Sequence, residues 1–192
     1  MKLVLATQNP KKLKEMNEIL SHLGVEVVSE AELGVRIEVE ETGETFTDNA
    51  RLKATAVMQA TGLPAVADDS GLCVDALNGG PGVYSARFGG EGLDDKGRYT
   101  LLLEMLRGQT DRAAHFHTSI VCAFPNGDEL VCEGECPGTI AFAPMGEGGF
   151  GYDPVFFVPE LRKTFGQLTA EEKAYVSHRG KALRAFAAAL DD

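Results

Sequence analysis

The chain has 192 residues and a formal net charge of −11, with 44% hydrophobic and 24% charged residues. This composition is ordinary for a globular protein with its own core, and the length fits one domain in which two lobes are plausible. The negative net charge argues against sequence-independent binding to nucleic acid and against binding to anionic membranes, because both need an extended basic surface. A small anionic ligand remains compatible, because basic residues cluster near both ends of the chain.

The first segment predicts a strand followed by a helix. Lys2–Ala6 is a short apolar run typical of a buried strand, and Asn9 and Pro10 suit the N-cap and first position of a helix that Gly24 closes. The free N–H groups of a helix start favour an anion, and lysines in the first turn oppose the helix dipole unless an anion is present. The segment by itself leaves two interpretations open, an anion site or a plain capped helix with solvated lysines.

Two short strands are expected next, at Val25–Ser29 and Val35–Val39, followed by a loop with three glutamates at 40–44. Such a loop is usually solvated, although one of its glutamates could serve as a metal ligand. A helix is expected from Thr47 to Thr61, with Gly62 as its stop.

The segment Ala65–Leu72 carries the most informative pattern of the chain. Small apolar residues predict the end of a buried strand, and Asp68, Asp69, Ser70 and a glycine then indicate a turn. Adjacent carboxylates repel each other, so they indicate either a Mg²⁺ or Mn²⁺ site or a solvated acidic turn. If the strand continued through the pair, the two side chains would point to opposite faces.

The middle of the chain predicts one more strand at Leu72–Leu77, a helix at Asp94–Arg107 and a hairpin. The hairpin joins Ala113–Phe124 to Glu129–Glu133 through a Pro-Asn-Gly-Asp turn. Before the helix, glycine pairs bracket the loop 83–88, which contains an arginine and two aromatic residues and is typical of a loop that closely approaches a ligand.

A second glycine-rich loop, at 146–154, precedes a short strand at Val155–Val158. Thr169 and Glu172 have the spacing of a capping box, and Ser177 is a suitable cap for a terminal amphipathic helix. The second half of the chain thus differs from the strand–helix pattern of the first and favours a second lobe on a single mixed sheet.

The four cysteines form no Cys-x-x-Cys pair, so we expect buried free thiols rather than a zinc site, while a disulfide between Cys122 and Cys132 stays open. His115 and His117 share a strand face and are expected to be structural. No apolar run approaches the length of a membrane span and no secretory signal is evident, so a cytoplasmic location is the expectation.

Taken together, these features supply a helix start suited to phosphate, carboxylates for a metal, an aromatic residue in a glycine-rich loop, and basic residues near the C-terminus. The chain resembles the inosine triphosphate pyrophosphatase (HAM1-like) family, which hydrolyses non-standard purine nucleoside triphosphates. The resemblance covers nearly the whole length and rests on these ordered segments: Thr7-Gln8-Asn9-Pro10-Lys11-Lys12, Glu40-Glu41-Thr42-Gly43, Ala67-Asp68-Asp69-Ser70-Gly71-Leu72, Pro81-Gly82-Val83-Tyr84-Ser85-Ala86-Arg87, Gly148-Gly149-Phe150-Gly151-Tyr152-Asp153-Pro154 and Ser177-His178-Arg179-Gly180.

The resemblance implies an α/β fold with a long central mixed sheet and two lobes flanking an active-site cleft. It implies Mg²⁺-dependent conversion of ITP, dITP or XTP to the monophosphate and pyrophosphate by a homodimer. Neither nucleic acid nor membrane is expected as a partner, because the net charge is −11. Two alternatives remain, a pyrophosphatase for modified pyrimidine triphosphates and a nucleotide sensor without turnover.

The same resemblance assigns roles to individual residues. Glu40 and Asp69 are implied as metal ligands, Asp69 also as the general base and Lys12 as a catalytic cation, while the role of Asp68 stays open. The implied substrate contacts are Thr7, Gln8, Asn9, Pro10, Lys11, Lys12, Ser70, Phe150, Gly151, Tyr152, Asp153, Lys173, His178 and Arg179.

Overall fold

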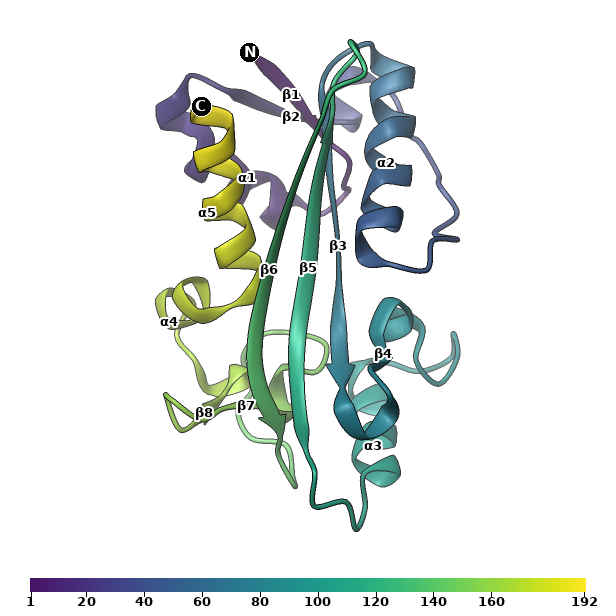
Figure 1. Cartoon of the computed structure of the whole chain (residues 1–192), viewed down its shortest axis with the longest axis vertical. Coiled ribbons are helices and arrows are strands. Elements are labelled where there is room, and N and C mark those ends of the chain that lie inside the picture. The colour runs from purple at the N-terminus through teal and green to yellow at the C-terminus, as the bar shows by residue number, and fades with distance from the viewer. The chain divides into compact units, whose positions relative to one another are not determined.

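The computed structural model describes the whole chain, residues 1–192, and divides into two compact units. Unit 1 contains Met1–Asp69, Thr118–Gly134 and Lys181–Asp192, and unit 2 contains Ser70–His117 and Glu135–Gly180. The strand order of the sheet is β2-β1-β3-β5-β6-β7-β8, with β4 paired to β3 (Figure 1). Parallel and antiparallel pairs both occur, which confirms the expected mixed α/β fold.

The regular elements alternate between strand and helix in the first half of the chain only. The strands are β1 (Lys2–Leu5), β2 (Glu26–Ser29), β3 (Ala65–Val74), β4 (Gly80–Pro81), β5 (Ala113–Ala123), β6 (Glu129–Ile140), β7 (Phe156–Val158) and β8 (Lys163–Thr164). The helices are α1 (Pro10–Leu20), α2 (Phe46–Thr61), α3 (Asp95–Met105), α4 (Ala170–Val176) and α5 (His178–Asp191).

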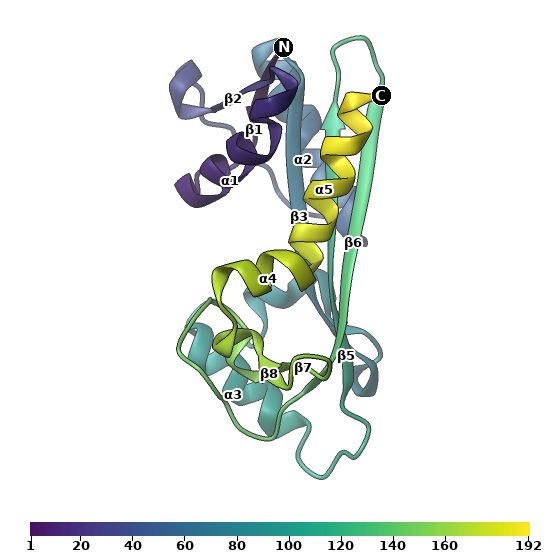
Figure 2. The ribbon, with the colours of Figure 1, turned by 90° about the vertical axis from the view of Figure 1, so that its left-hand side faces the viewer.

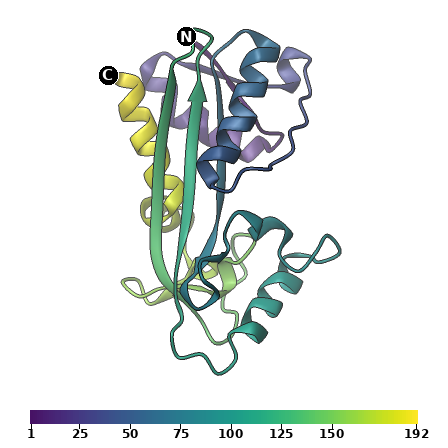
Figure 3. The ribbon, with the colours of Figure 1, turned by 45° about the vertical axis from the view of Figure 1, so that its right-hand side comes forward.

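In unit 1, helices cover both faces of the strands. Side chains of α1 and α5 pack with Leu3, Leu5 and Val66 on one face, whereas α2 packs with Ala67 on the other. Figures 1 and 2 show α1 and α5 on the side of the strands opposite α2, and Figure 3 shows α2 running alongside β3 and β5. Alternate residues of β3 therefore face different helices, as the two-residue period of a strand requires.

Unit 2 has a core of its own, which is centred on aromatic side chains. Phe116 of β5 lies with its ring centroid 4.5 Å from that of Phe156 and 5.3 Å from that of Phe165. Leu102 of α3 and Ile140 of β6 are fully buried in the same cluster. Burial of this apolar surface stabilises the unit and provides a firm base for the loops that it carries.

The expected turn after Ala67 is wrong, because β3 continues through Asp68, Asp69 and Ser70 as far as Val74. The expected strand at Leu72–Leu77 is accordingly the end of β3 followed by a 3₁₀ turn. The strand can continue because both carboxylates have partners in the folded chain, so their mutual repulsion is offset locally.

The expected strand at Val35–Val39 is also absent. Its residues alternate between half-buried and exposed, as in a strand, but no neighbouring strand pairs with them. Instead, the N–H group of Ile37 donates to a carboxylate oxygen of Glu30, at 3.3 Å. A side chain thus satisfies the backbone group that a sheet would otherwise have satisfied.

Most other boundaries are confirmed within one or two residues, and β6 extends seven residues beyond the expected Glu133, to Ile140. Thr169 and Glu172 form the expected capping box of α4, and the Ser177 hydroxyl caps the start of α5 by accepting from the Gly180 N–H. All four cysteines are free, which leaves no Cys122–Cys132 disulfide. None of the helices combines the length and the apolar character that crossing a bilayer requires.

Candidate active site

The expected site residues are divided between the two units. Unit 1 carries the segment 7–12, Glu40 and Asp69, which are the expected phosphate and metal positions. Unit 2 carries the remaining expected substrate-binding positions, which are Ser70, Phe150, Gly151, Tyr152, Asp153, Lys173, His178 and Arg179.

The start of α1 is built as the sequence predicts. The Asn9 carboxamide oxygen accepts from the Lys11 N–H at 3.0 Å, and the Thr7 hydroxyl accepts from the Asn9 N–H at 3.2 Å. No acidic residue lies in the first turn, while Gln8, Asn9, Pro10 and Lys11 are exposed. An exposed helix start whose first turn holds no acidic residue to offset the positive dipole end favours an anion.

Lys12 is not a solvated lysine, which the alternative of a plain capped helix would require. Its ammonium lies 3.1 and 3.3 Å from the two carboxylate oxygens of Asp68, which is only 9% exposed. Asp68 faces the α1 side of β3, so the pair ties the helix start to the strand. The structure thereby gives Asp68 a role that the sequence left open, since it fixes the position of Lys12.

Asp69 projects from the opposite face of β3 and is half-buried. One of its carboxylate oxygens accepts from the Asn49 amide at 3.2 Å, and its backbone carbonyl accepts from the Thr118 hydroxyl. Burial raises the pKa of Asp69 from 3.8 to about 6, with the Lys53 charge opposing this rise and the Glu41 charge adding to it. Asp69 is therefore ionised near neutral pH but more basic than an exposed aspartate, which suits a general base.

The loop of glutamates lies against α2. Glu41 forms an ion pair with Lys53 at 3.0 Å, and the same Lys53 ammonium donates to the backbone carbonyl of Asp68 at 2.6 Å. Glu40 is exposed. Lys53, Glu41 and Asp68 are the charged groups that shift the pKa of Asp69.

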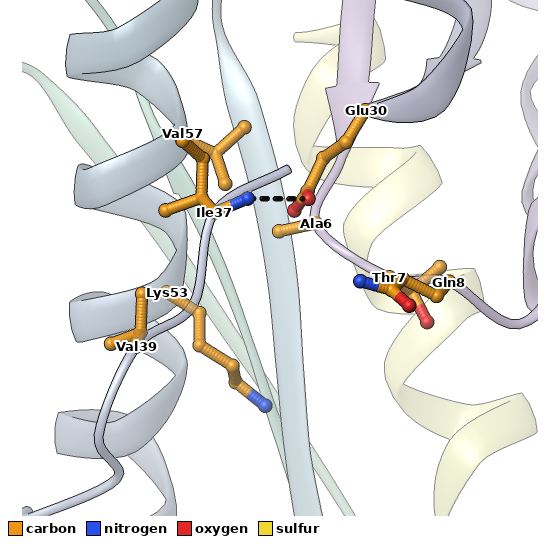
Figure 4. A pocket seen from close by; sticks show the side chains of 8 residues that line it. All are labelled: Ala6, Thr7, Gln8, Glu30, Ile37, Val39, Lys53 and Val57. Carbon is orange, nitrogen blue, oxygen red and sulfur yellow. Dashed lines mark hydrogen bonds between the residues drawn. The ribbon is translucent and has the colours of Figure 1, made fainter. Parts of the chain in front are cut away.

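A pocket of about 200 Å³ opens in unit 1 between the end of β1 and helix α2. Figure 4 shows the Lys53 side chain extending from α2 toward the side on which Thr7 and Gln8 lie. The pocket is lined by Ala6, Thr7, Gln8, Glu30, Ile37, Val39, Lys53 and Val57. Part of the expected phosphate segment and a lysine therefore line one pocket, and two residues of the unpaired segment 35–39 line it as well.

The residues of unit 1 fit a hard cation in their chemistry. The expected ligands Glu40 and Asp69 offer carboxylate oxygens, which Mg²⁺ prefers. No group of three or more metal-ligating side chains comes together anywhere in the chain, including around His115 and His117, where His117 instead bonds to Glu135 at 2.9 Å. Mg²⁺ characteristically uses one or two carboxylates and completes its shell with water and substrate phosphates, so a two-carboxylate site suffices.

In unit 2, the glycine-rich loop is folded around the buried carboxylate of Asp153. That carboxylate accepts from the Phe150 N–H at 3.0 Å and from the Lys173 ammonium at 2.6 Å. Gly149 has a φ of +74°, and a Cβ at this position would collide with Asp153. Burial raises the pKa of Asp153, against the opposing charge of Lys173. Asp153 thus shapes the loop and binds Lys173.

Phe150 is the exposed aromatic residue of this loop. Its side chain is 72% exposed, and the Lys173 ammonium lies 4.6 Å from the ring centroid. An exposed ring with a cation over it is suited to stacking on a flat ligand. The structure therefore brings together Phe150, Asp153 and Lys173, three of the expected substrate positions.

Tyr152 is buried and points away from solvent. Its hydroxyl donates to the carbonyl of Ser85 at 2.6 Å, and the Ser85 hydroxyl accepts from the Leu72 N–H at 2.9 Å. The Gly151 N–H donates to Asp95 at 2.9 Å. These bonds connect the glycine-rich loop to the end of β3, to the loop at 82–87 and to the start of α3, so Tyr152 and Gly151 fix the shape of the loop.

The two basic residues after Ser177 stand at the start of α5. The His178 ring is stacked on Phe116 with centroids 4.8 Å apart, so it is anchored to the aromatic core of unit 2. Arg179 is half-buried, and Ser70 is exposed.

Several of these residues had no assignment from sequence reasoning. Asn49 and Lys53 lie one turn apart on α2 and contact Asp69 and Asp68, respectively. A signal for them did exist, because an asparagine and a lysine at i and i+4 border the apolar stripe of Ala50 and Ala54.

Known proteins resemble this chain over nearly its whole length. The profile of the Ham1 family matches residues 3–189. The chain is 50% identical to a dITP/XTP pyrophosphatase of Exiguobacterium sp. (99% of this chain, 97% of the relative) and 53% identical to one of Thermus thermophilus (100% and 93%).

Among solved structures, a Staphylococcus aureus Ham1 protein matches with a TM-score of 0.95 at 42% identity, covering 100% of this chain and 98% of that chain. A nucleoside-triphosphatase / dITP/XTP pyrophosphatase of Mycobacterium abscessus matches with a TM-score of 0.84 at 47% identity, covering 97% and 98%. A match of this extent in sequence and in fold shows that the chain belongs to the Ham1 family.

Proposed function

We propose that this chain hydrolyses non-standard purine nucleoside triphosphates, namely ITP, dITP and XTP, to the nucleoside monophosphate and pyrophosphate. Full-length relatives named dITP/XTP pyrophosphatase, at 50% and 54% identity, support this function. The structural observation that carries it is in unit 1, where the lysine-bearing start of α1 is bound to Asp68 of β3, and the next residue of that strand is Asp69, the carboxylate with the raised pKa. A triphosphate needs such a cationic cradle, and hydrolysis needs a carboxylate beside it.

We propose Mg²⁺ as the cofactor, held by Glu40 and Asp69. When bound, Mg²⁺ supplies the positive charge that stabilises negative charge developing on the phosphate oxygens. The oxygen-only donors of this region support the assignment.

The protein's own groups have separate tasks in this reaction. The first-turn N–H groups and Lys11 bind and orient the phosphates, while Lys12, held by Asp68, contributes a fixed positive charge. The raised pKa of Asp69 enables its carboxylate to orient a water molecule and accept its proton as the water attacks the α-phosphorus. The leaving group is pyrophosphate.

Residues of unit 2 would recognise the base. Phe150 offers a face for stacking on a purine. Arg179 and neighbouring backbone N–H groups would donate to a 6-oxo group, and the 6-amino group of adenine would leave such a donor unpaired. A site of this kind can reject the wrong ligand by ~10⁴-fold. Guanine shares the 6-oxo group, so discrimination against GTP has to act on its 2-amino group.

We also propose that the chain forms a homodimer and acts in the cytoplasm, as the family resemblance implies. Light scattering coupled to size exclusion tests the dimer, because a mass near the 20.5 kDa of one chain would refute it.

A panel of nucleoside triphosphates tests the activity. With Mg²⁺, pyrophosphate release should be fast for ITP, dITP and XTP and far slower for ATP and CTP. Comparable rates for all common nucleotides would contradict the specificity, and preference for a modified pyrimidine would favour that alternative function. A chain that binds ITP without releasing pyrophosphate would be a sensor. The Asp69→Asn variant should keep ITP binding while losing turnover.

A further inference from the structure

Asn49 is a buried polar residue in the second turn of α2. It is 1% exposed, and the adjacent Ala50 is completely buried against β3 and β5. A carboxamide without access to water is destabilising unless its polar atoms find partners within the protein. The partners of Asn49 therefore indicate why an amide occupies this buried position.

Both ends of the carboxamide are used, and each faces a complementary group. The oxygen accepts from the Gly43 N–H at 2.7 Å, and the nitrogen donates to the Asp69 carboxylate at 3.2 Å. The orientation is dictated by chemistry, because only the amide nitrogen can donate to a carboxylate and only the oxygen can accept from an N–H group. One side chain thus joins the glutamate loop to the acidic position of β3.

Gly43 allows this close approach. A Cβ on Gly43 would lie 2.7 Å from the Asn49 carboxamide oxygen and 2.6 Å from Cβ of Asp48. Real Cβ atoms do not tolerate such distances, so any larger residue would push the loop away from α2. The loop that carries Glu40 and Glu41 is therefore seated on the helix at Gly43.

Lys53 repeats the connection one turn later on the same helix. It pairs with Glu41 at 3.0 Å and donates to the backbone carbonyl of Asp68 at 2.6 Å. Because Lys53 holds the glutamate side chain, whereas Asn49 holds the loop backbone, the two contacts fix different parts of the loop.

We propose that Asn49 is a positioning residue, which holds the glutamate loop and the Asp69 carboxylate in one fixed arrangement before metal and nucleotide bind. This inference rests on the proposed function for its catalytic consequence, but the arrangement itself is a property of the free protein. Groups that orient metal ligands in this way typically change metal affinity or activity by 10–100-fold when they are removed.

The single variants Asn49→Ala, Asn49→Asp and Gly43→Ala and the double variant Asn49→Ala/Gly43→Ala test the proposal, with Gly92→Ala as a matched control. A Cβ on the control glycine would have no atom within 4 Å, and the residue has no positive φ, so its substitution should change nothing. The Asp variant keeps an acceptor for the Gly43 N–H but offers Asp69 a second carboxylate. It therefore separates the loop contact from the Asp69 contact.

Hydrogen exchange in the metal-free protein is the first measurement. The Gly43 amide should exchange at least tenfold faster in Asn49→Ala than in wild type and should stay protected in Asn49→Asp. Unchanged protection in Asn49→Ala would overturn the loop half of the proposal.

Mn²⁺ binding, measured by electron paramagnetic resonance without nucleotide, is the second measurement. Asn49→Ala and Gly43→Ala should each weaken binding about 10-fold or more, and the double variant should lose little beyond either single change. Wild-type affinity in Gly43→Ala would contradict the proposal, even if Asn49→Ala failed to fold.

Steady-state kinetics with ITP is the third measurement. Asn49→Ala and Asn49→Asp should lower kcat at least 10-fold while KM for ITP stays within about 3-fold. A change confined to KM would overturn the role at Asp69. If wild type does not hydrolyse ITP, the proposed function fails, whereas the first two measurements still decide the role of Asn49.

Discussion

Replacing Asp69 with asparagine should make the metal-free protein more stable while removing its activity. Burial raises the pKa of Asp69 from 3.8 to about 6, so keeping this carboxylate ionised at neutral pH opposes folding. The difference between the two values, at 1.36 kcal/mol per pKa unit, sets a ceiling of about 3 kcal/mol. Since Asp69 is only half-buried and solvent screens part of the effect, we expect about 1–2 kcal/mol.

The pH dependence of this gain has a definite sign. A carboxyl whose pKa is higher in the folded state stabilises the fold at acid pH, and that contribution is lost as pH rises through the folded pKa. Wild type and Asp69→Asn should therefore have the same stability near pH 4 and diverge up to about pH 6, with a constant gap above. Because asparagine retains an oxygen acceptor for Asn49, the variant keeps that hydrogen bond.

Differential scanning calorimetry in EDTA, between pH 4 and 8, measures the effect. For a chain of this size the gain corresponds to a Tm increase of about 2–8 °C at pH 7.5. Asp75→Asn, at an exposed position, is the matched control and should shift Tm by less than about 1 °C. A lower Tm for Asp69→Asn at pH 7.5, or a difference independent of pH, would refute the reasoning.

Three further substitutions probe the other contacts. Lys12→Met leaves the buried Asp68 carboxylate without its cation and should lower the free energy of unfolding by about 2 kcal/mol in urea titrations, while slowing pyrophosphate release. Phe150→Ala removes an exposed ring, so it should raise KM for ITP about 10-fold at unchanged Tm; unchanged KM would exclude stacking. Tyr152→Phe loses the bond to Ser85 and should destabilise by about 1 kcal/mol, whereas no loss in urea titrations would show that the bond contributes nothing.

Local signals predicted the helices and most strands. Caps at Asn9, Thr169 and Ser177 all lie where the sequence places them, because a cap depends on residues only two or three positions away. The mixed sheet was also predicted, since hydrophobic runs and turn residues are local features.

The errors occurred where distant segments decide the structure. Asp68-Asp69-Ser70-Gly71 has the composition of a turn, but Lys12 and Asn49 hold the two carboxylates and allow the strand to continue. Residues 35–39 have the pattern of a strand, but the sheet offers them no partner. In both cases the tertiary surroundings, rather than the local pattern, determine the backbone structure.

The structure gives several of the expected site residues structural tasks that the sequence did not indicate. Asp153 and Tyr152 are buried and fix the loop that presents Phe150, and Lys12 is held by Asp68. Whether a residue contacts the ligand or supports the loop depends on which side chains are buried, and burial follows from the fold rather than from any single motif.

The central claim is that the chain cleaves the bond between the α- and β-phosphates. ³¹P nuclear magnetic resonance of the products formed from ITP and Mg²⁺ tests this most directly. Cleavage at this bond should give IMP and pyrophosphate in equal amounts, with no IDP at any time. IDP and orthophosphate as the first products would contradict it.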